Sequence, residues 1–179
     1  MIQTITTSQS ILEQVASKTI TSATELSLPE EPNSSVILQA DEQTLLVTIG
    51  QEGKLRPIKK QYQACGIKPR SPEQTFLLYY LFSTVPLVIV TGRCGTGKSY
   101  LAMAVAAEIV INNKGPQSQL ILCRSLSETG PHRMGAMPGT FREKIEPYLD
   151  SYKEVLSYLL GEDTMYSIEK MEAQGSIQF

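Results

Sequence analysis

The chain has 179 residues, of which 41% are hydrophobic, and a formal net charge of −2. This length allows one packed domain with a small appendage. The near-neutral charge excludes a global field that draws the chain to nucleic acid or membranes, so any such contact needs a local patch. The 3 cysteines are widely spaced and odd in number, which argues against a disulfide framework or metal-ligand spacing and suits a reducing compartment. Because no signal peptide or membrane-spanning run is present, we expect a cytoplasmic protein.

Residues 1–34 are expected to form a flexible N-terminal arm. They are rich in Ser and Thr and carry few large apolar side chains, a composition that disfavours a packed core. The helical spacing of Ile11, Leu12 and Val15 leaves one marginal helix as an alternative.

Residues 35–60 predict a small β unit. The apolar, β-branched runs 36–38 and 45–49 are typical of strands, and residues 41–43 form the turn of a hairpin between them. A second turn is expected at 50–53. Such a hairpin is marginal by itself, so it must pack against another element.

A helix is predicted to begin after Ser71. Ser71 is a good N-cap, Pro72 suits the first helical position, and Gln74 stands where a capping-box residue closes the cap. Residues 75–82 continue the helix and are apolar nearly all round, which predicts extensive burial. The Gln74 amide offers a donor and an acceptor together, so pairing with a base edge and closure of the cap are both open for this side chain.

Residues 91–99, Thr-Gly-Arg-Cys-Gly-Thr-Gly-Lys-Ser, match the phosphate-binding loop pattern G-x-x-x-x-G-K-[ST] at every fixed position. The context agrees, because the run 87–90 is expected to be a buried strand and the run 101–108 a helix. A glycine-rich turn that carries Lys-Ser by chance is the alternative, and the strand–loop–helix order argues against it.

This loop has the chemistry of an anion cradle. Gly92, Gly95 and Gly97 let the backbone curl around phosphate oxygens. The N–H groups that open the helix face the β-phosphate, where the helix dipole adds positive potential. Lys98 can reach the β- and γ-phosphates, and the Ser99 hydroxyl can ligate Mg²⁺.

A second buried strand is predicted at 119–123, after a helix stop at 112–116. Together with the first strand it would form a right-handed α/β crossover. Arg124 follows at the edge where open α/β sheets hold ligands. The Gly- and Pro-punctuated segment 130–139 is either a binding loop or an ordinary connection. It contains His132, the only histidine, which we interpret as a surface residue rather than a catalytic one.

The last third of the chain is predicted to be mainly helical. Residues 141–160 have an apolar helical face, with a break considered at Pro147, and Gly161 suits the C-cap. A short helix near 168–171 and a last strand at 176–179 follow.

Together these residues resemble the PhoH-like family of P-loop ATPases, named for phosphate-starvation-inducible proteins. The resemblance is carried by residues 66–74, 92–100, 122–124, 135–139 and 143–148. The P-loop alone would fit many families, whereas Gly-x-x-Pro-Gly followed by Glu-Lys-Ile-x-Pro-Tyr, the last two of these segments, is far more specific.

The resemblance implies an α/β fold with a RecA-like P-loop NTPase parallel sheet, related to the nucleotide core of superfamily 1 helicases. It implies ATP and Mg²⁺ as cofactors, Gln74 as the adenine reader, Lys98 as the catalytic lysine and Ser99 as the metal ligand. It also implies a ring-forming homo-oligomer linked to RNA, with Arg124 in the RNA-facing motif. The predicted nucleotide-binding set is Gln74, Gly92, Arg93, Cys94, Gly95, Thr96, Gly97, Lys98, Ser99 and Tyr100.

The printed sequence has no recognisable Walker B element, the apolar strand ending in Asp-Glu that follows in the family. The nearest candidate, 158–163, ends a helical pattern and is interrupted by Gly161, so we interpret it as a helix C-terminus. Phosphoryl transfer needs an acidic group to fix Mg²⁺ and a group to orient water. We therefore expect 61–179 to be the N-terminal part of a longer ATPase domain. Without the flanking strands, residues 88–90 would expose unpaired backbone and apolar faces.

Two functions stay open. The chain is an ATP-binding domain that hydrolyses ATP, in RNA-coupled or assembly work, only when a downstream half completes it, so turnover by the chain alone is expected to be negligible. Alternatively it is a non-catalytic interaction module that caps or regulates a full-length ATPase ring. A nucleotide kinase is disfavoured because the visible loops carry no lid-like arginine cluster.

Overall fold

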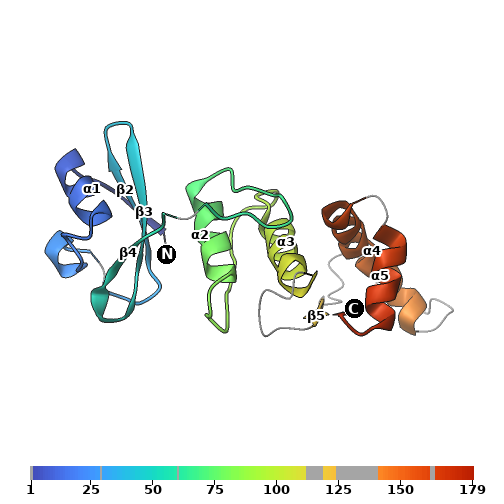
Figure 1. The fold of residues 1–179 in the computed structure, drawn as a ribbon. Helices are drawn as coiled ribbons and strands as arrows, with labels where there is room; N and C mark the ends of the chain where they lie inside the picture. The colour runs from blue at the N-terminus through green and yellow to red at the C-terminus, as the bar shows by residue number, and fades with distance from the viewer. Residues whose placement is uncertain (1, 29, 60, 112–118, 124–140, 162–163) are drawn as a thin grey trace, which may run out of the picture. The chain divides into compact units, whose positions relative to one another are not determined.

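The computed structural model describes residues 2–28, 30–59, 61–111, 119–123, 141–161 and 164–179 (Figure 1). The chain forms two compact units, of which the first contains Met1–Gln63 and Lys68–Pro86 and the second contains Ala64–Ile67 and Leu87–Phe179. This division differs from the predicted one, in which everything after residue 60 formed one domain. Within the described ranges, no helix is both long enough and apolar enough to cross a membrane.

The first unit is built on a four-stranded sheet in the order β1-β2-β3-β4. Its strands are β1 (Ile2–Thr6), β2 (Ser35–Ala40), β3 (Gln43–Ile49) and β4 (Leu55–Pro57). β1 runs parallel to β2, whereas β2 and β3, and β3 and β4, pair antiparallel. The predicted hairpin is confirmed, since Ala40 faces Gln43 and Asp41 has a φ of 48° in the tight turn between them. A 3-10 turn, η2 (Gln51–Gly53), makes the second predicted turn.

The segment predicted to be a flexible arm is folded, so that prediction is wrong. β1 pairs with β2 along its whole length, and the alternative helix forms as α1 (Gln9–Ala16). Ser8 caps α1 by accepting a hydrogen bond from the Ile11 N–H at 3.4 Å, and Val15 is fully buried in the core of this unit. A short 3-10 turn, η1 (Thr24–Leu26), follows. The Ser- and Thr-rich composition was misleading because β-branched Ile and Thr favour a strand once a partner strand lies beside them.

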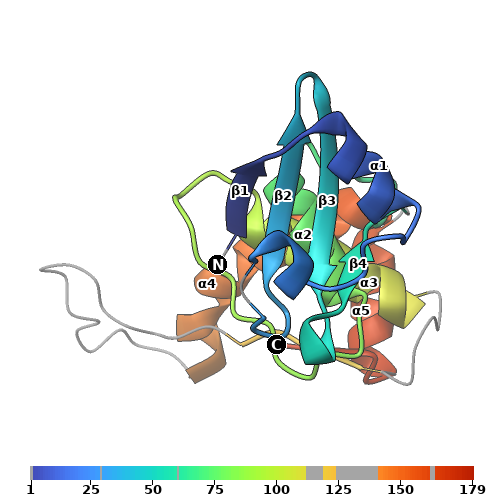
Figure 2. The ribbon, with the colours of Figure 1, turned by 90° about the vertical axis from the view of Figure 1, so that its left-hand side faces the viewer.

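α2 (Pro72–Leu81) covers the face of the sheet opposite to α1 (Figure 2). Its predicted cap is confirmed, because the Ser71 Oγ accepts a hydrogen bond from the Gln74 N–H at 3.3 Å and Pro72 lies in the first turn. The extensive burial predicted for residues 75–82 is found, since Phe76 and Leu78 are buried and the other residues of this run are partly buried. The helix therefore contributes two large, fully buried side chains, Phe76 and Leu78, together with half-buried tyrosines.

Two tyrosines of α2 join the helix to the sheet through a set of hydrogen bonds that we call the tyrosine clamp. The Tyr80 hydroxyl donates to the carbonyl of Asn33 at 2.6 Å and lies 3.1 Å from the Ser35 Oγ. The Tyr79 hydroxyl accepts a hydrogen bond from the Thr48 Oγ1 at 3.3 Å. Ser35 and Thr48 are only 4% and 2% exposed, so the clamp supplies hydrogen bonds to two buried hydroxyls, of which Thr48 also contacts the Arg56 carbonyl at 3.4 Å.

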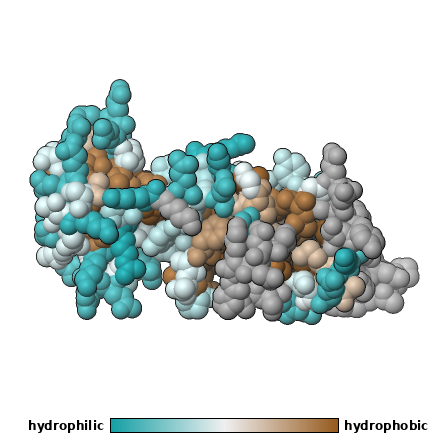
Figure 3. Space-filling model, in the orientation of Figure 1, coloured by the Kyte–Doolittle hydropathy of each residue, from teal (hydrophilic) through white to brown (hydrophobic). Residues whose placement is uncertain are grey.

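The second unit combines helices with a short parallel strand pair. Its elements are α3 (Lys98–Ile111), β5 (Leu120–Ile121), α4 (Phe141–Leu160), α5 (Thr164–Ala173) and β6 (Ile177–Gln178). β5 pairs with β6 in parallel, and Leu156 of α4 and Ile168 of α5 are buried in the same core as Leu120 and Ile177. The predicted helices and the predicted last strand are confirmed, and α4 runs through Pro147 as one helix. Figure 3 shows that hydrophobic residues reach the surface of this unit.

The strand predicted before the phosphate loop does not form. Residues 87–90 belong to no strand, and Leu87 and Ile89 are 72% and 79% exposed. In the described part of the chain, no hydrogen bond involves the backbone of these residues. The predicted crossover from this strand through α3 is therefore also absent, and β5 finds its parallel partner in β6 instead. The expectation that this segment exposes apolar faces in the absence of flanking strands is confirmed.

A four-residue turn, Ala64–Ile67, packs against α3. Its ends exchange two backbone hydrogen bonds of 3.0 and 2.8 Å, and its central residues Cys65 and Gly66 have φ values of 46° and 75°, the pattern of a type I′ turn. The Cys65 N–H donates to the Glu108 carboxylate at 2.8 Å, and the Cys65 thiol lies 3.4 Å from the Ala104 carbonyl. The turn is thus anchored on α3 by one charge-assisted hydrogen bond.

Several predictions lie outside the described residues. They concern the helix stop at 112–116, Arg124, the segment 130–139 with His132, and the acidic pair at 162–163.

Candidate phosphate-binding site

The loop 91–97 is curled by three glycines with positive φ. Gly92, Gly95 and Gly97 have φ values of 148°, 75° and 79°, which L-residues with a side chain rarely adopt. A Cβ on Gly92 would lie 3.7 Å from the Lys98 Cδ and 3.8 Å from the Thr96 Oγ1. A side chain would therefore fit at this position, and glycine is required by the backbone conformation instead.

The Lys98 side chain folds back across this loop. Its ammonium donates to the Arg93 carbonyl at 2.5 Å and lies 3.4 Å from the Thr96 Oγ1. The Thr96 hydroxyl also donates to the Arg93 carbonyl, at 2.9 Å. An ammonium has three donors, so these two contacts leave a third for an oxygen of a ligand. The loop is closed rather than splayed, and Lys98 lies over it.

Backbone donors gather at the same place. In the described part of the chain, the N–H groups of Gly95, Gly97, Lys98 and Ser99 have no hydrogen-bond partner. The Leu101 N–H makes the first turn of α3, donating to the Gly97 carbonyl at 2.9 Å, so the preceding N–H groups point out of the helix end. The dipole of α3 adds positive potential there. Such a set of donors can hold an anion with the size and charge of a phosphate.

The other predicted loop residues lie around this cradle. The side chains of Arg93, Cys94 and Ser99 are exposed, and Cys94 is a free thiol. Ser99 follows Lys98 directly, in the first turn of α3, where its hydroxyl is accessible to a metal ion. Tyr100 is half-buried and packs near Tyr158, with ring centroids 6.3 Å apart.

Gln74 belongs to the first unit, whereas the loop belongs to the second. Its Oε1 accepts a hydrogen bond from the Arg70 N–H at 2.7 Å. In a standard capping box the donor is the N–H of the N-cap residue, here Ser71, which is one residue later. Its capping role is therefore confirmed in a shifted form, and its adenine role stays a prediction. At the same helix end, a hydrogen bond from Ser71 lowers the pKa of Glu73.

The structure brings together the loop glycines, Thr96, Lys98 and Ser99, and it adds one residue that the sequence did not single out. That residue is Tyr158 of α4, which is 74% exposed. The only signal for it in the sequence is that an aromatic side chain lies outside the apolar face of the predicted helix. Arg124 is outside the described residues.

The fold and the site define a mixed α/β chain that carries the phosphate-loop sequence pattern at the start of a helix. The chain belongs to the family described as PhoH-like protein, whose family model matches residues 66–179. The β sheet of the first unit precedes that matched region.

Relatives of known sequence agree with this assignment. The chain is 31% identical over 115 residues to protein PhoH2 of Bacillus subtilis, and 27% identical over 115 residues to protein PhoH2 of Thermobispora bispora. These matches cover 63% and 64% of the chain and 26% of each relative. A PhoH-like protein of Bacillus subtilis is 36% identical over 92 residues, which cover 51% of the chain and 27% of the relative. The matched part of the chain thus spans about a quarter of the length of the curated relatives. No solved structure matches the chain.

Proposed function

We propose that the chain binds ATP together with Mg²⁺ through residues 91–99. The observation that carries the proposal is the joint presence of four unpartnered backbone N–H groups, at Gly95, Gly97, Lys98 and Ser99, and the Lys98 ammonium in one glycine-curled loop. Hydrogen bonds to a charged group are each worth about 1.5–3 kcal/mol, so a few of them suffice for specific phosphate binding.

Each group has a distinct role in this proposal. The backbone N–H groups and the α3 dipole hold the β-phosphate. Lys98 donates its third hydrogen to a phosphate oxygen, as a point charge that neutralises the triphosphate. The exposed Ser99 hydroxyl ligates Mg²⁺ between the phosphates. Gln74 is proposed to read the adenine edge.

Hydrolysis is proposed to require a completing segment. The family resemblance places the acidic Mg²⁺ ligand in a Walker B strand, and the relatives are about four times as long as the part that the chain matches. In this proposal the intact assembly has a RecA-like ring and RNA contact through Arg124. Mixing the chain with the C-terminal part of a PhoH-like protein and measuring phosphate release tests the requirement. Release by the chain alone at the rate of the mixture contradicts it.

The binding proposal is tested by titration with a fluorescent ATP analogue in the presence of Mg²⁺. Lys98→Ala is expected to weaken binding by roughly 10- to 100-fold, because it removes a charge-assisted contact. Lys170→Ala is the matched control, since it removes the same charge from an exposed position of the second unit and is expected to leave affinity unchanged. Equal affinity in the wild type and Lys98→Ala refutes the cradle.

A second candidate function, the interaction module, is favoured by residues 87–90. Their backbone makes no hydrogen bond in the described part of the chain, and Leu87 and Ile89 are 72% and 79% exposed. Such a segment can accept a strand from another polypeptide. We propose a full-length PhoH-like protein as the partner.

Size-exclusion chromatography of the chain mixed with a PhoH-like protein tests this function. Ile89→Asp is expected to abolish the complex, because a charge enters the apolar contact. Ile121→Asp is the control at another exposed isoleucine of the same unit, and Lys98→Ala should leave the complex intact. A complex that persists in Ile89→Asp refutes the proposal.

A further inference from the structure

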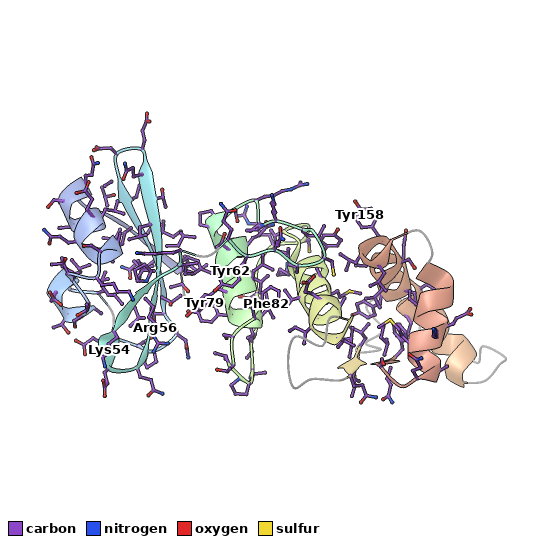
Figure 4. The ribbon with its side chains drawn as sticks, viewed as in Figure 1. Lys54, Arg56, Tyr62, Tyr79, Phe82 and Tyr158 are labelled. Atoms are coloured by element: carbon purple, nitrogen blue, oxygen red, sulfur yellow. The ribbon has the colours of Figure 1, made fainter. Side chains whose placement is uncertain are left out.

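An aromatic pair adjoins the phosphate loop within the second unit. Tyr100 lies in the first turn of α3 and Tyr158 in the last turn of α4. Their ring centroids are 6.3 Å apart and the ring planes are inclined by 49°. Figure 4 shows Tyr158 at the end of α4, with its side chain standing out from the helix.

Tyr158 is not needed for the core of this unit. The buried residue of that helical turn is Leu156, which is 0% exposed, with Val155, Leu159 and Leu160 packed against the same core. Tyr158 is 74% exposed, and it is the only aromatic residue among the large exposed hydrophobic side chains of the described ranges. A solvent-exposed aromatic ring offers a large apolar surface that a ligand can cover. Packing in the core does not explain why an aromatic residue stands at this position.

The pair lies next to the phosphate donors. Tyr100 directly follows Ser99 and comes two residues after Lys98, so all three belong to one turn of α3, which rises about 1.5 Å per residue. In a nucleotide, a single ribose separates the base from the phosphates. A nucleotide held by the loop therefore brings its base within reach of a ring that packs against Tyr100.

We propose that Tyr158, held in place by Tyr100, is a stacking platform for the purine base of the bound nucleotide. This inference rests on the proposed ATP binding. The inclination of 49° between the rings excludes a parallel sandwich, so the base stacks on the exposed face of Tyr158 while Tyr100 supports that ring from the other side. Stacking uses the π-face that every base has, so it strengthens nucleotide binding without selecting adenine over guanine. Any selection of adenine over guanine would come from a residue that hydrogen-bonds the base edge, the role proposed for Gln74.

The first experiment compares ATP with inorganic tripolyphosphate, which has the phosphates but no base. Tyr158→Leu removes the ring and keeps an apolar side chain, and it is expected to weaken ATP binding by about 5- to 100-fold with no change for tripolyphosphate. Tyr158→Phe keeps the ring and is expected to retain the wild-type affinity for both ligands. GTP should lose affinity in Tyr158→Leu by a factor similar to that for ATP.

A spectroscopic experiment reads the contact directly. The chain contains 0 tryptophans, so Tyr158→Trp places the only indole at the platform. ATP and GTP are expected to quench its fluorescence, and tripolyphosphate is expected to leave it unchanged.

The outcomes separate this inference from the function on which it rests. If Tyr158→Leu binds ATP as tightly as the wild type, or if ATP leaves the indole fluorescence unchanged, the platform is refuted while phosphate binding stands. If the wild type binds neither ATP nor tripolyphosphate, both proposals fail together. If Tyr158→Leu weakens both ligands equally, the residue supports the fold of the loop and the platform is likewise refuted.

Discussion

Replacement of Tyr80 by phenylalanine tests whether the tyrosine clamp holds the first unit together. The Tyr80 hydroxyl donates to the Asn33 carbonyl at 2.6 Å and bonds the Ser35 Oγ at 3.1 Å. Tyr80→Phe removes both contacts, and it leaves the hydroxyl of Ser35, which is 4% exposed, without this partner. An unsatisfied buried hydroxyl costs about 1–3 kcal/mol, so we expect a loss of about 2 kcal/mol in the free energy of unfolding.

Tyr79→Phe is the matched comparison. The Thr48 Oγ1 loses its contact with Tyr79 but keeps the carbonyl of Arg56 at 3.4 Å as an acceptor, so we expect a smaller loss of about 0.5 kcal/mol. Hydrogen exchange of the β2 and β3 amides, followed by mass spectrometry, reads the stability of this unit separately from the other. Equal losses in the two variants, or no loss in Tyr80→Phe, contradict the clamp.

Three further outcomes are expected. Burial raises the pKa of Tyr80 above its ordinary value of 10.0, so the folded state keeps this proton longer. The resulting stabilisation is present below pH 10 and is lost as the pH rises through the folded-state pKa; alkaline exchange experiments should show a shallower loss in Tyr80→Phe. Ser71→Ala should destabilise α2 by about 1 kcal/mol and raise the pKa of Glu73 toward its ordinary value, as measured by NMR titration; an unchanged carboxyl pKa refutes the bond. Leu156→Ala, at a fully buried site, should cost about 2–5 kcal/mol in urea unfolding, whereas Leu87→Ala, at a site 72% exposed, should cost less than about 0.5 kcal/mol; similar costs contradict the assigned core.

Local sequence signals predicted the elements that carry their own determinants. The cap at Ser71, the glycines of the phosphate loop and the apolar face of α4 each act over a few residues, and each predicted element formed. The hairpin β2–β3 formed for the same reason, because its two runs are joined by a short turn.

The failures occurred where a distant partner decides the structure. A strand requires a neighbour, and residues 87–90 have a strand-like pattern but no pairing in the described ranges. β1 is the converse, since Ile2–Thr6 has a weak pattern but lies beside β2. The tyrosine clamp and the Tyr100–Tyr158 pair join residues 31 or more positions apart, and no local periodicity can reveal such contacts.

The turn Ala64–Ile67 has a consequence for how the chain is assembled and cut. Because this turn belongs to the second unit while the residues on both sides of it belong to the first, the chain passes between the units three times, at 63–64, 67–68 and 86–87. On the ribosome, the first unit has all of its sequence available before α3 emerges, and the turn must wait for Glu108 before it can anchor. A single proteolytic cut between β4 and α2 therefore yields two fragments that remain associated. α2 stays in the later fragment, while its tyrosines keep their hydrogen bonds to the sheet in the earlier one.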